Sequence, residues 1–315
     1  MALGSCKKGE EKRLFPNVTG DAGEVVLMIN QNKWESKIGL EFRKILLGDQ
    51  IGLPQPEPLF DLVNIPHSAF SKIFQPHRNL IFAKISSEYK EPKITIQTNL
   101  WSKTQLVINM VAPNDSSFLN LIIENKEKIV THLLNAERRR ILSNYKKYEE
   151  RHIREQLQKN HSLSLIVPKG YTLNVDSSNF VWISHETSQI SQGIFVYYYD
   201  YVDTNTFTVD YLLNKRNIFL KKHVPGPSPN SYMTTERNYK PNFIEFEYNN
   251  RYFAELRGLY RVENNFYGGP FMSVSTIDEK RNRVVTVEGF VYAPQLKKRN
   301  YLRQLEAILY TLEIK

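Results

Sequence analysis

The chain has 315 residues, 41% of them hydrophobic and 12% aromatic, so it can bury at least one full core and is rich in strand-forming residue types. Its formal net charge of +9 favours an anionic partner, and its single cysteine excludes an internal disulfide framework. No stretch of the sequence approaches the ~18 consecutive apolar residues that a membrane-spanning helix requires.

The N-terminal segment contains Leu3-Gly4-Ser5-Cys6, which loosely fits the lipobox of bacterial lipoproteins because small side chains precede the thiol. Charged residues at positions 7–13 predict a solvated stretch. We therefore expect residues 1–22 to be a lipid-anchor tether with an acyl chain on Cys6. The basic and apolar parts of a signal peptide do not precede this motif, so we expect a late start codon or a trimmed chain. The alternative is an incidental cysteine in a frayed terminus.

Residues 23–113 are predicted to form an N-terminal α+β unit. The near-continuous apolar run at 24–30 is typical of a central strand that is covered on both faces. Apolar residues then recur at helical spacing from Trp34 to Leu46, and this helix is expected to end near Gly48, before a proline cluster at 54–58. Further strands are predicted at 59–65, 79–85, 93–99 and 104–112.

Residues 114–160 are predicted to form one long connecting helix. Asn114 and Asp115 can cap its start, and apolar positions from Phe118 onward step by multiples of about 3.6 residues. Its basic residues are interspersed with glutamates, which favours a solvated face with local ion pairs over an anion-binding surface. The basic residues are Arg138, Arg139, Arg140, Lys146, Lys147, Arg151 and Arg154.

Residues 161–315 are predicted to form a C-terminal α+β unit. The bulky run at 193–201 is typical of a central strand, and apolar positions from Leu302 to Leu312 predict a closing amphipathic helix. The predicted fold class is α+β, with mixed and largely antiparallel sheets in two halves that are joined by the long helix. The other elements predicted here are strands at 162–167, 180–184, 242–249 and 252–263, a helix at 207–222, and a hairpin of 271–277 with 283–292.

Standard catalytic signatures are missing from the sequence, including the Walker loop, the G-x-G-x-x-G turn, the nucleophile elbow and H-E-x-x-H. The seven histidines show no ligand spacing, so we expect no metal site and no cofactor. The alternative to a binding role is a hydrolase that acts on an envelope polymer. Its acid and base carboxylates would be residues such as Glu245, Glu247 or Glu255, brought together by the fold.

Tyr267-Gly268-Gly269-Pro270 is the first candidate binding feature, because paired glycines permit positive φ and a close approach of backbone or ligand. Arg257 and Tyr260 precede it closely. A structural turn between strands is the favoured interpretation. A binding loop flanked by aromatic side chains is the alternative.

The second candidate is the basic cluster Lys297, Lys298, Arg299 and Arg303 in the first turns of the last helix. Cations at a helix N-terminus oppose the helix dipole, so we expect a nearby carboxylate or a bound anion to compensate. A surface patch that pairs with local acids is favoured. Binding of phosphate, a lipid headgroup or an acidic glycan is the alternative.

Several stretches together resemble an uncharacterised, domain-of-unknown-function family of lipoproteins typical of Bacteroidetes. The resemblance spans nearly the whole chain and implies an exported lipoprotein with an acylated Cys6. It implies no activity. The matching stretches are 15–20, 23–26, 52–58, 225–233, 268–271 and 298–306.

These observations predict a lipoprotein of the cell envelope, facing the periplasm or the cell surface, that binds or scaffolds rather than catalyses. The expected partners are the membrane, through the lipid, and an anionic envelope component or an envelope protein. Nucleic acid is the least favoured partner, because only the net charge supports it.

Overall fold

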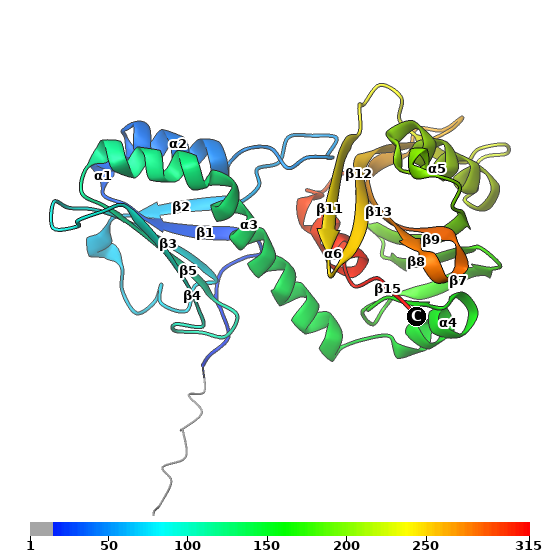
Figure 1. Cartoon of the computed structure of the whole chain (residues 1–315), viewed down its shortest axis with the longest axis horizontal. Helices are drawn as coiled ribbons and strands as arrows, with labels where there is room; N and C mark the ends of the chain where they lie inside the picture. Colours follow the sequence, from blue (N-terminus) through cyan, green and yellow to red (C-terminus); the bar gives the residue numbers. More distant parts are fainter. Residues whose placement is uncertain (1–14) are drawn as a thin grey trace, which may run out of the picture. The chain divides into compact units, whose positions relative to one another are not determined.

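The computed structural model describes residues 15–315, so Cys6 and the predicted acyl chain lie outside the described part of the chain. The chain divides into two compact units (Figure 1). The N-terminal unit comprises residues up to Leu46 together with Phe60–Ala136, and the C-terminal unit comprises Leu47–Leu59 together with Glu137–Lys315. The structure contains helices together with sheets in which some strand pairs are parallel and most are antiparallel. This arrangement confirms the predicted α+β class.

The N-terminal unit is built on a five-stranded sheet of order β2-β1-β3-β5-β4. Strand β1 has neighbours on both sides, and its residues Val25–Met28 are at most 1% exposed, as expected for a strand that is covered on both faces. In this order, the neighbouring strands β2, β1, β3 and β5 pair in parallel, which the sequence did not predict for this unit. Strand β4 pairs with β5 in the antiparallel direction. The bounds are β1 Glu24–Met28, β2 Asp61–Ile65, β3 Asn79–Ile85, β4 Lys93–Thr98 and β5 Leu106–Ala112.

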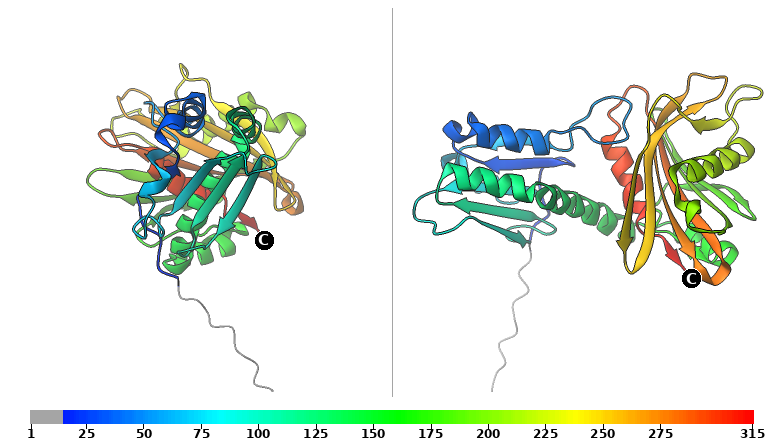
Figure 2. Two further views of the ribbon diagram at one scale, coloured as in Figure 1. Left: turned by 90° about the vertical axis from the view of Figure 1, so that its left-hand side faces the viewer. Right: turned by 45° about the horizontal axis from the view of Figure 1, so that its top comes forward.

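Helices cover one face of this sheet, and the first part of α3 lies beside α2 in both views (Figures 1 and 2). The rings of Phe42 and Phe118 meet there, 6.3 Å apart. The predicted cap of α3 is confirmed, because Asn114 Oδ1 accepts the backbone N–H of Ser117 at 2.9 Å. Aromatic side chains, including Phe70 and Trp101, pack against a cluster of buried apolar side chains from strands β1, β3 and β5. The helices are α1 Gln31–Trp34, α2 Lys37–Leu46 and α3 Asp115–Lys147, with a 3-10 turn at His67–Ala69.

The predicted tether of residues 1–22 is too long. Residues 15–22 pack on the N-terminal unit, where Asn17 forms a bridge with Lys103 and Thr19 forms one with His77. Buried His77 also contacts Glu24, with 3.1 Å between Nε2 and Oε1. These contacts fix the chain before β1.

The predicted single helix at 114–160 is wrong. Helix α3 ends at Lys147, and α4 (Arg151–His161) begins after a break. In the break, the N–H of Glu150 bonds to the C=O of Val167, and the N–H of Lys169 bonds to the C=O of Tyr148, both at 2.8 Å. The backbone therefore leaves the helix to pair with a distant segment, which helical periodicity cannot show.

The C-terminal unit contains an antiparallel sheet of order β10-β12-β13-β14-β9-β8-β7, with β11 also paired to β12. Strand β9 is internal, as its bulky sequence predicted, whereas β7 was not predicted. The bounds are β7 Thr172–Ser177, β8 Phe180–Glu186, β9 Ser191–Asp200, β10 Met233–Thr235, β11 Asn242–Tyr248, β12 Arg251–Val262, β13 Gly268–Asp278 and β14 Arg283–Tyr292; β6 Leu163–Ser164 pairs with β15 Glu313–Ile314.

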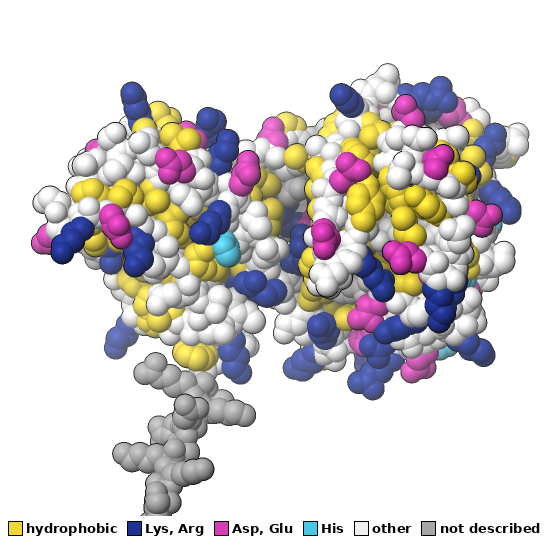
Figure 3. Space-filling model, viewed as in Figure 1, with side chains coloured by type: hydrophobic (Ala, Val, Ile, Leu, Met, Phe, Trp, Pro, Cys, Tyr) yellow, Lys and Arg dark blue, Asp and Glu magenta, His cyan; other side chains and the backbone are white. Residues whose placement is uncertain are grey.

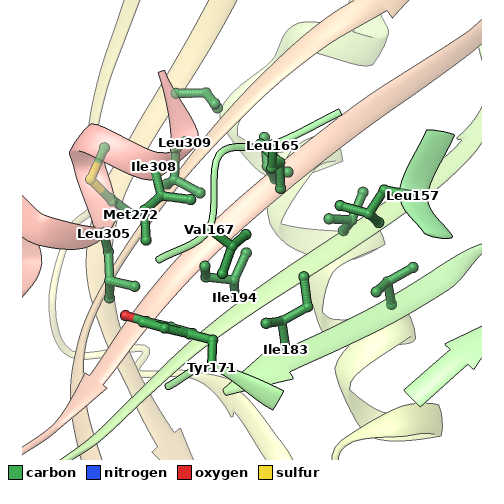
Figure 4. Close-up of a cluster of buried hydrophobic side chains, with 14 of the residues drawn as sticks. Leu157, Leu165, Val167, Tyr171, Ile183, Ile194, Met272, Leu305, Ile308 and Leu309 are labelled. Carbon is green, nitrogen blue, oxygen red and sulfur yellow. The ribbon is translucent and has the colours of Figure 1, made fainter. Parts of the chain in front are cut away.

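Both faces of this sheet carry apolar cores, because alternate residues of the inner strands point to opposite sides. In β9, Ile194 and Val196 join the core under α4 and α6 (Arg299–Leu309), whereas Phe195 and Tyr197 join the core under α5 (Val209–His223). Figure 4 shows the first core, with Leu305 and Ile308 of α6 above the strands. The sheet is therefore the middle of three layers.

A buried ion pair holds α5 on the sheet. Arg216 of α5 donates to Glu288 of β14 at 2.9 and 2.7 Å, and the two side chains are 1% and 0% exposed. The Arg216 guanidinium also donates to Thr235 and lies 3.7 Å from the Phe271 ring centroid. Both charges are therefore paired within an otherwise apolar core.

We predict that Glu288→Ala lowers the free energy of unfolding by about 3–5 kcal/mol, because it leaves the Arg216 charge buried without its partner. Urea unfolding followed by circular dichroism measures this loss. The double variant Arg216→Met/Glu288→Leu should recover most of it. As a matched control, Glu263→Ala removes a partly exposed pair with Arg261 and should cost less than about 1 kcal/mol. Equal losses in the two glutamate variants would contradict the prediction.

Candidate functional site

The C-terminal unit contains a groove of about 1090 Å³, here called the α5 groove. Residues of α5 form one wall, and the segment 235–243 forms the other. Asn217 of α5 holds the base of that segment, because its Oδ1 accepts the N–H and the hydroxyl of Thr235 at 3.0 and 2.8 Å. The groove is lined by Ile51, Val209, Asp210, Leu213, Asn217, Thr235, Glu236, Arg237, Asn238, Tyr239, Lys240, Pro241, Asn242 and Phe243.

The charges in this groove are not all neutralised by neighbours. Within residues 15–315, Arg237 and Lys240 make no ion pair, and both are exposed. Glu236 accepts the N–H of Asn238 at 2.8 Å, and Asp210 lies in the first turn of α5, where the helix dipole favours an acid. Two cations beside aromatic side chains therefore remain available to a ligand.

A smaller hollow of about 450 Å³ continues past Phe243, which lines both cavities. Its walls are aromatic, and the rings of Phe207 and Tyr252 meet edge to face at 4.8 Å. The Tyr252 hydroxyl donates to Glu245 at 2.5 Å, and burial together with that carboxylate raises the pKa of Tyr252. In Figure 3, hydrophobic side chains with acidic ones around them lie on this face of the C-terminal unit.

Arg257, a predicted binding residue, is instead part of a buried charge cluster. Its Nε donates to Glu255 at 2.6 Å, and its Nη2 donates to Glu306 at 3.0 Å. Arg138 also bonds to Glu306 and lies 4.0 Å from the ring centroid of Tyr310, whose hydroxyl donates to Glu255 at 2.9 Å. Two cations and two carboxylates thus compensate one another inside the unit.

This cluster sets the protonation of Glu306. Burial alone would raise the pKa of its carboxyl, but Arg257 and Arg138 hold that pKa at about 2, below its ordinary value of 4.5. The same carboxylates outweigh burial at Arg257 and raise the pKa of its guanidinium. Both Glu306 and Arg257 are therefore charged at neutral pH.

The structure explains the glycine pair without positive φ, so that part of the prediction is wrong. Gly268 and Gly269 are the first residues of β13, and a Cβ on Gly269 would lie 2.2 Å from the Val291 carbonyl oxygen. Tyr260 is buried in the core under α5, whereas Tyr267 is exposed and its ring centroid lies 5.0 Å from that of Tyr292. Close backbone approach between strands is the reason for the glycines.

The basic cluster of the last helix is mostly buried, not a surface patch. Lys298, Arg299 and Arg303 are 4%, 5% and 7% exposed, and only Lys297 is exposed. The compensating carboxylate is Glu57, which accepts the backbone N–H groups of Lys298 and Arg299 at 2.6 and 3.0 Å.

The segment Leu47–Leu59 supplies this carboxylate and further acceptors. Arg299 donates to the Pro58 carbonyl at 2.8 Å, and Arg303 donates to the Leu59 carbonyl at 2.6 Å. Burial and the neighbouring Arg299 lower the pKa of Arg303 to about 10, so the guanidinium stays charged at neutral pH. The proline-rich segment Leu47–Leu59 therefore holds the N-terminal end of helix α6 through these hydrogen bonds.

The three carboxylates named for a hydrolase do not all lie on one face of the sheet. Glu245 pairs across the hairpin with Ala254, and Glu247 pairs with Tyr252, so both point to the α5 face. Glu255 points to the opposite face, where it bonds to Arg257 and Tyr310. In addition, no group of three His, Cys, Asp or Glu side chains among residues 15–315 is placed to hold a metal ion. None of the helices in that range is long and apolar enough to span a membrane.

Arg237, Tyr239 and Lys240 were not selected from the sequence. They lie in a loop between β10 and β11, and the sequence Arg237-Asn238-Tyr239-Lys240-Pro241 mixes cations, an aromatic residue and a proline. That composition is the signal that could have found them.

Two family models match the chain. A domain of unknown function (DUF4837) matches residues 150–311, and a second domain of unknown function (DUF8532) matches residues 18–146. The chain belongs to the DUF4837 family. The predicted resemblance to an uncharacterised family is thereby confirmed. The DUF4837 region includes every residue that lines the α5 groove except Ile51.

No curated protein matches the chain. Among solved structures, the Ran-binding protein Mog1p of Saccharomyces cerevisiae is similar at a TM-score of 0.34 and 6% identity, covering 49% of this chain and 90% of that protein. LpqN of Mycobacterium tuberculosis, described as involved in cell envelope biogenesis, is similar at a TM-score of 0.31 and 12% identity, covering 49% and 83%. These likenesses are too distant to assign a function.

Within the DUF4837 region, Glu306 gives a pH-dependent prediction. Because its pKa in the folded protein is about 2, below the ordinary 4.5, its contribution to stability is present above pH 4.5 and is lost as the pH falls towards 2. Glu306→Gln should cost roughly 3 kcal/mol at pH 7. The difference between wild type and variant should shrink through that window in urea unfolding curves. A difference that does not change with pH would contradict the role of Glu306.

Proposed function

We propose that this protein is a non-catalytic binding module of the cell envelope, anchored by a lipid on Cys6, and that it binds an anionic ligand in the α5 groove. The observation that carries the binding proposal is the pair of unneutralised cations, Arg237 and Lys240, beside Tyr239 and Phe243. Concave sites with aromatic walls and a few polar groups are typical of ligand binding.

The contrast with the other charged groups supports this choice. Glu306, Arg257, Arg216 and Glu288 are all engaged in internal pairs. Their contribution is to the stability of the unit, since a ligand would have to break a buried pair to reach them. The ligand class that suits the groove carries carboxylate or phosphate groups together with apolar surface, as acidic glycans do.

The anchor is tested by metabolic labelling of the full-length precursor with a palmitate analogue. We expect labelled protein in the membrane fraction, and we expect Cys6→Ala to abolish the label because the thiol is the only one in the chain. The matched control is Ser5→Ala, which keeps the thiol and the small side chain before it. Equal labelling of the wild type and Cys6→Ala would remove the anchor from the proposal.

Binding is tested on an array of acidic and neutral oligosaccharides. We expect the wild type to retain acidic members, and Arg237→Ala/Lys240→Ala to bind them at least tenfold more weakly, since hydrogen bonds to charged groups contribute about 1.5–3 kcal/mol each. The control Lys222→Ala/Lys280→Ala removes the same charge from two exposed positions outside the groove. Equal weakening of both double variants would mean non-specific attraction and would contradict the groove as the site.

A further inference from the structure

Strand β11 offers a second binding surface at the edge of the C-terminal sheet. It pairs with β12 over seven residues without a shift of register. Among residues 15–315, no strand pairs with its other side. A straight edge with free main-chain groups is a template for another extended chain.

The hairpin turn decides which main-chain groups of β11 are free. Asn249 and Asn250 have φ of 52° and 58°, as in a two-residue type I′ turn, so Tyr248 and Arg251 close the hairpin as a hydrogen-bonded pair. Hydrogen-bonded pairs alternate along an antiparallel ladder. The N–H and C=O groups of Phe243, Glu245 and Glu247 therefore point outward, away from β12.

The opposite edge of the same sheet is protected, which makes the open edge of β11 distinctive. Strand β7 has an irregular register between Leu173 and Val175, and a bulge of this kind interrupts pairing with an added strand. Strand β11 has no such irregularity and no proline within it.

The side chains of β11 define the partner. Glu245 and Glu247 are exposed on one face, while Ile244 and Tyr248, on the other face, are 45% and 42% exposed. Opposite charges and apolar pairs across neighbouring strands each contribute roughly 0.2–1 kcal/mol. A second copy of the chain fits poorly, because full-length antiparallel pairing of two β11 strands sets Glu245 against Glu245 or Glu247.

We propose that the outer edge of β11 docks an extended segment of a partner protein in which Lys or Arg alternates with apolar residues. The segment adds a strand to the sheet: its main chain bonds to Phe243, Glu245 and Glu247, and its cations face the two glutamates. This surface shares Phe243 with the α5 groove but includes neither Arg237 nor Lys240, so the groove variants leave its main-chain groups and its two glutamates in place.

The probe is a capped eight-residue peptide of alternating Lys and Val, compared with its Glu–Val counterpart, on the full chain. We expect the Lys peptide to bind and to slow amide hydrogen exchange at Phe243, Glu245 and Glu247. The alternate residues Ile244 and Phe246 already donate to β12, so they should change little. Binding without slower exchange at the three outward amides would overturn the proposal.

Charge reversal supplies the matched variants. Glu245→Lys/Glu247→Lys should bind the Lys peptide at least tenfold more weakly and gain affinity for the Glu peptide. The control Glu124→Lys/Glu279→Lys makes the same change of net charge at two exposed positions that are not part of β11, and it should keep the original preference. Loss of preference in both variants would overturn the proposal.

A proline variant separates strand addition from simple charge attraction. Glu245→Pro removes one outward N–H but no ladder bond to β12, so the fold should persist by circular dichroism while the affinity for the Lys peptide falls. Unchanged affinity would overturn the proposal. Concentration-dependent dimers of the wild type that Glu245→Pro abolishes would assign the edge to a second copy instead.

Discussion

The carboxylate of Glu306 joins three parts of the C-terminal unit: the end of α3 through Arg138, strand β12 through Arg257, and the closing helix α6 to which it belongs. A carboxylate that is buried in an apolar layer stays charged only if neighbouring cations neutralise it. Glu255 supplies the second negative charge, so the cluster is balanced. The position of α6 on the sheet, and with it the core shown in Figure 4, depends on this balance.

The same reasoning separates structural charges from functional ones. The sequence shows a basic protein but does not show which cations are already paired. In the C-terminal unit, Arg216, Arg257 and Arg283 each have an acidic partner, and the last of these bonds to Asp278 at 2.9 Å. Arg237 and Lys240 differ because they border a hollow without such a partner among the described residues. An unpaired cation beside a cavity is therefore more informative here than the net charge.

Apolar runs and turn residues in the sequence predicted those strands whose limits depend on nearby residues alone. The strands at 79–85 and 283–292 have the predicted bounds, because each is a bulky apolar segment between clear breaks. Strand β7 was missed because its residues alternate between exposed and half-buried positions with few apolar side chains. The break after Lys147 was missed because pairing with the segment near Val167 creates it.

The candidate sites were harder to predict because their contacts are distant in sequence. Glu57 lies 241 residues from Lys298, and no periodicity links the two. The composition near Arg257 suggested a ligand, yet its carboxylate partner Glu306 is 49 residues away. Only the folded chain shows that these cations are neutralised, whereas Arg237 and Lys240 of the α5 groove have no acidic partner among the described residues.

The placement of Leu47–Leu59 limits how the chain can be divided. The chain leaves the N-terminal unit after Leu46 and re-enters it at Phe60, and the segment between these residues is part of the C-terminal unit. A single cut between the two family matches would therefore separate helix α6 from Glu57 and from Arg138. Each region matches its own family model, but neither can be exchanged by itself. A chimaera would have to keep the segment Leu47–Leu59 and helix α6 from the same protein.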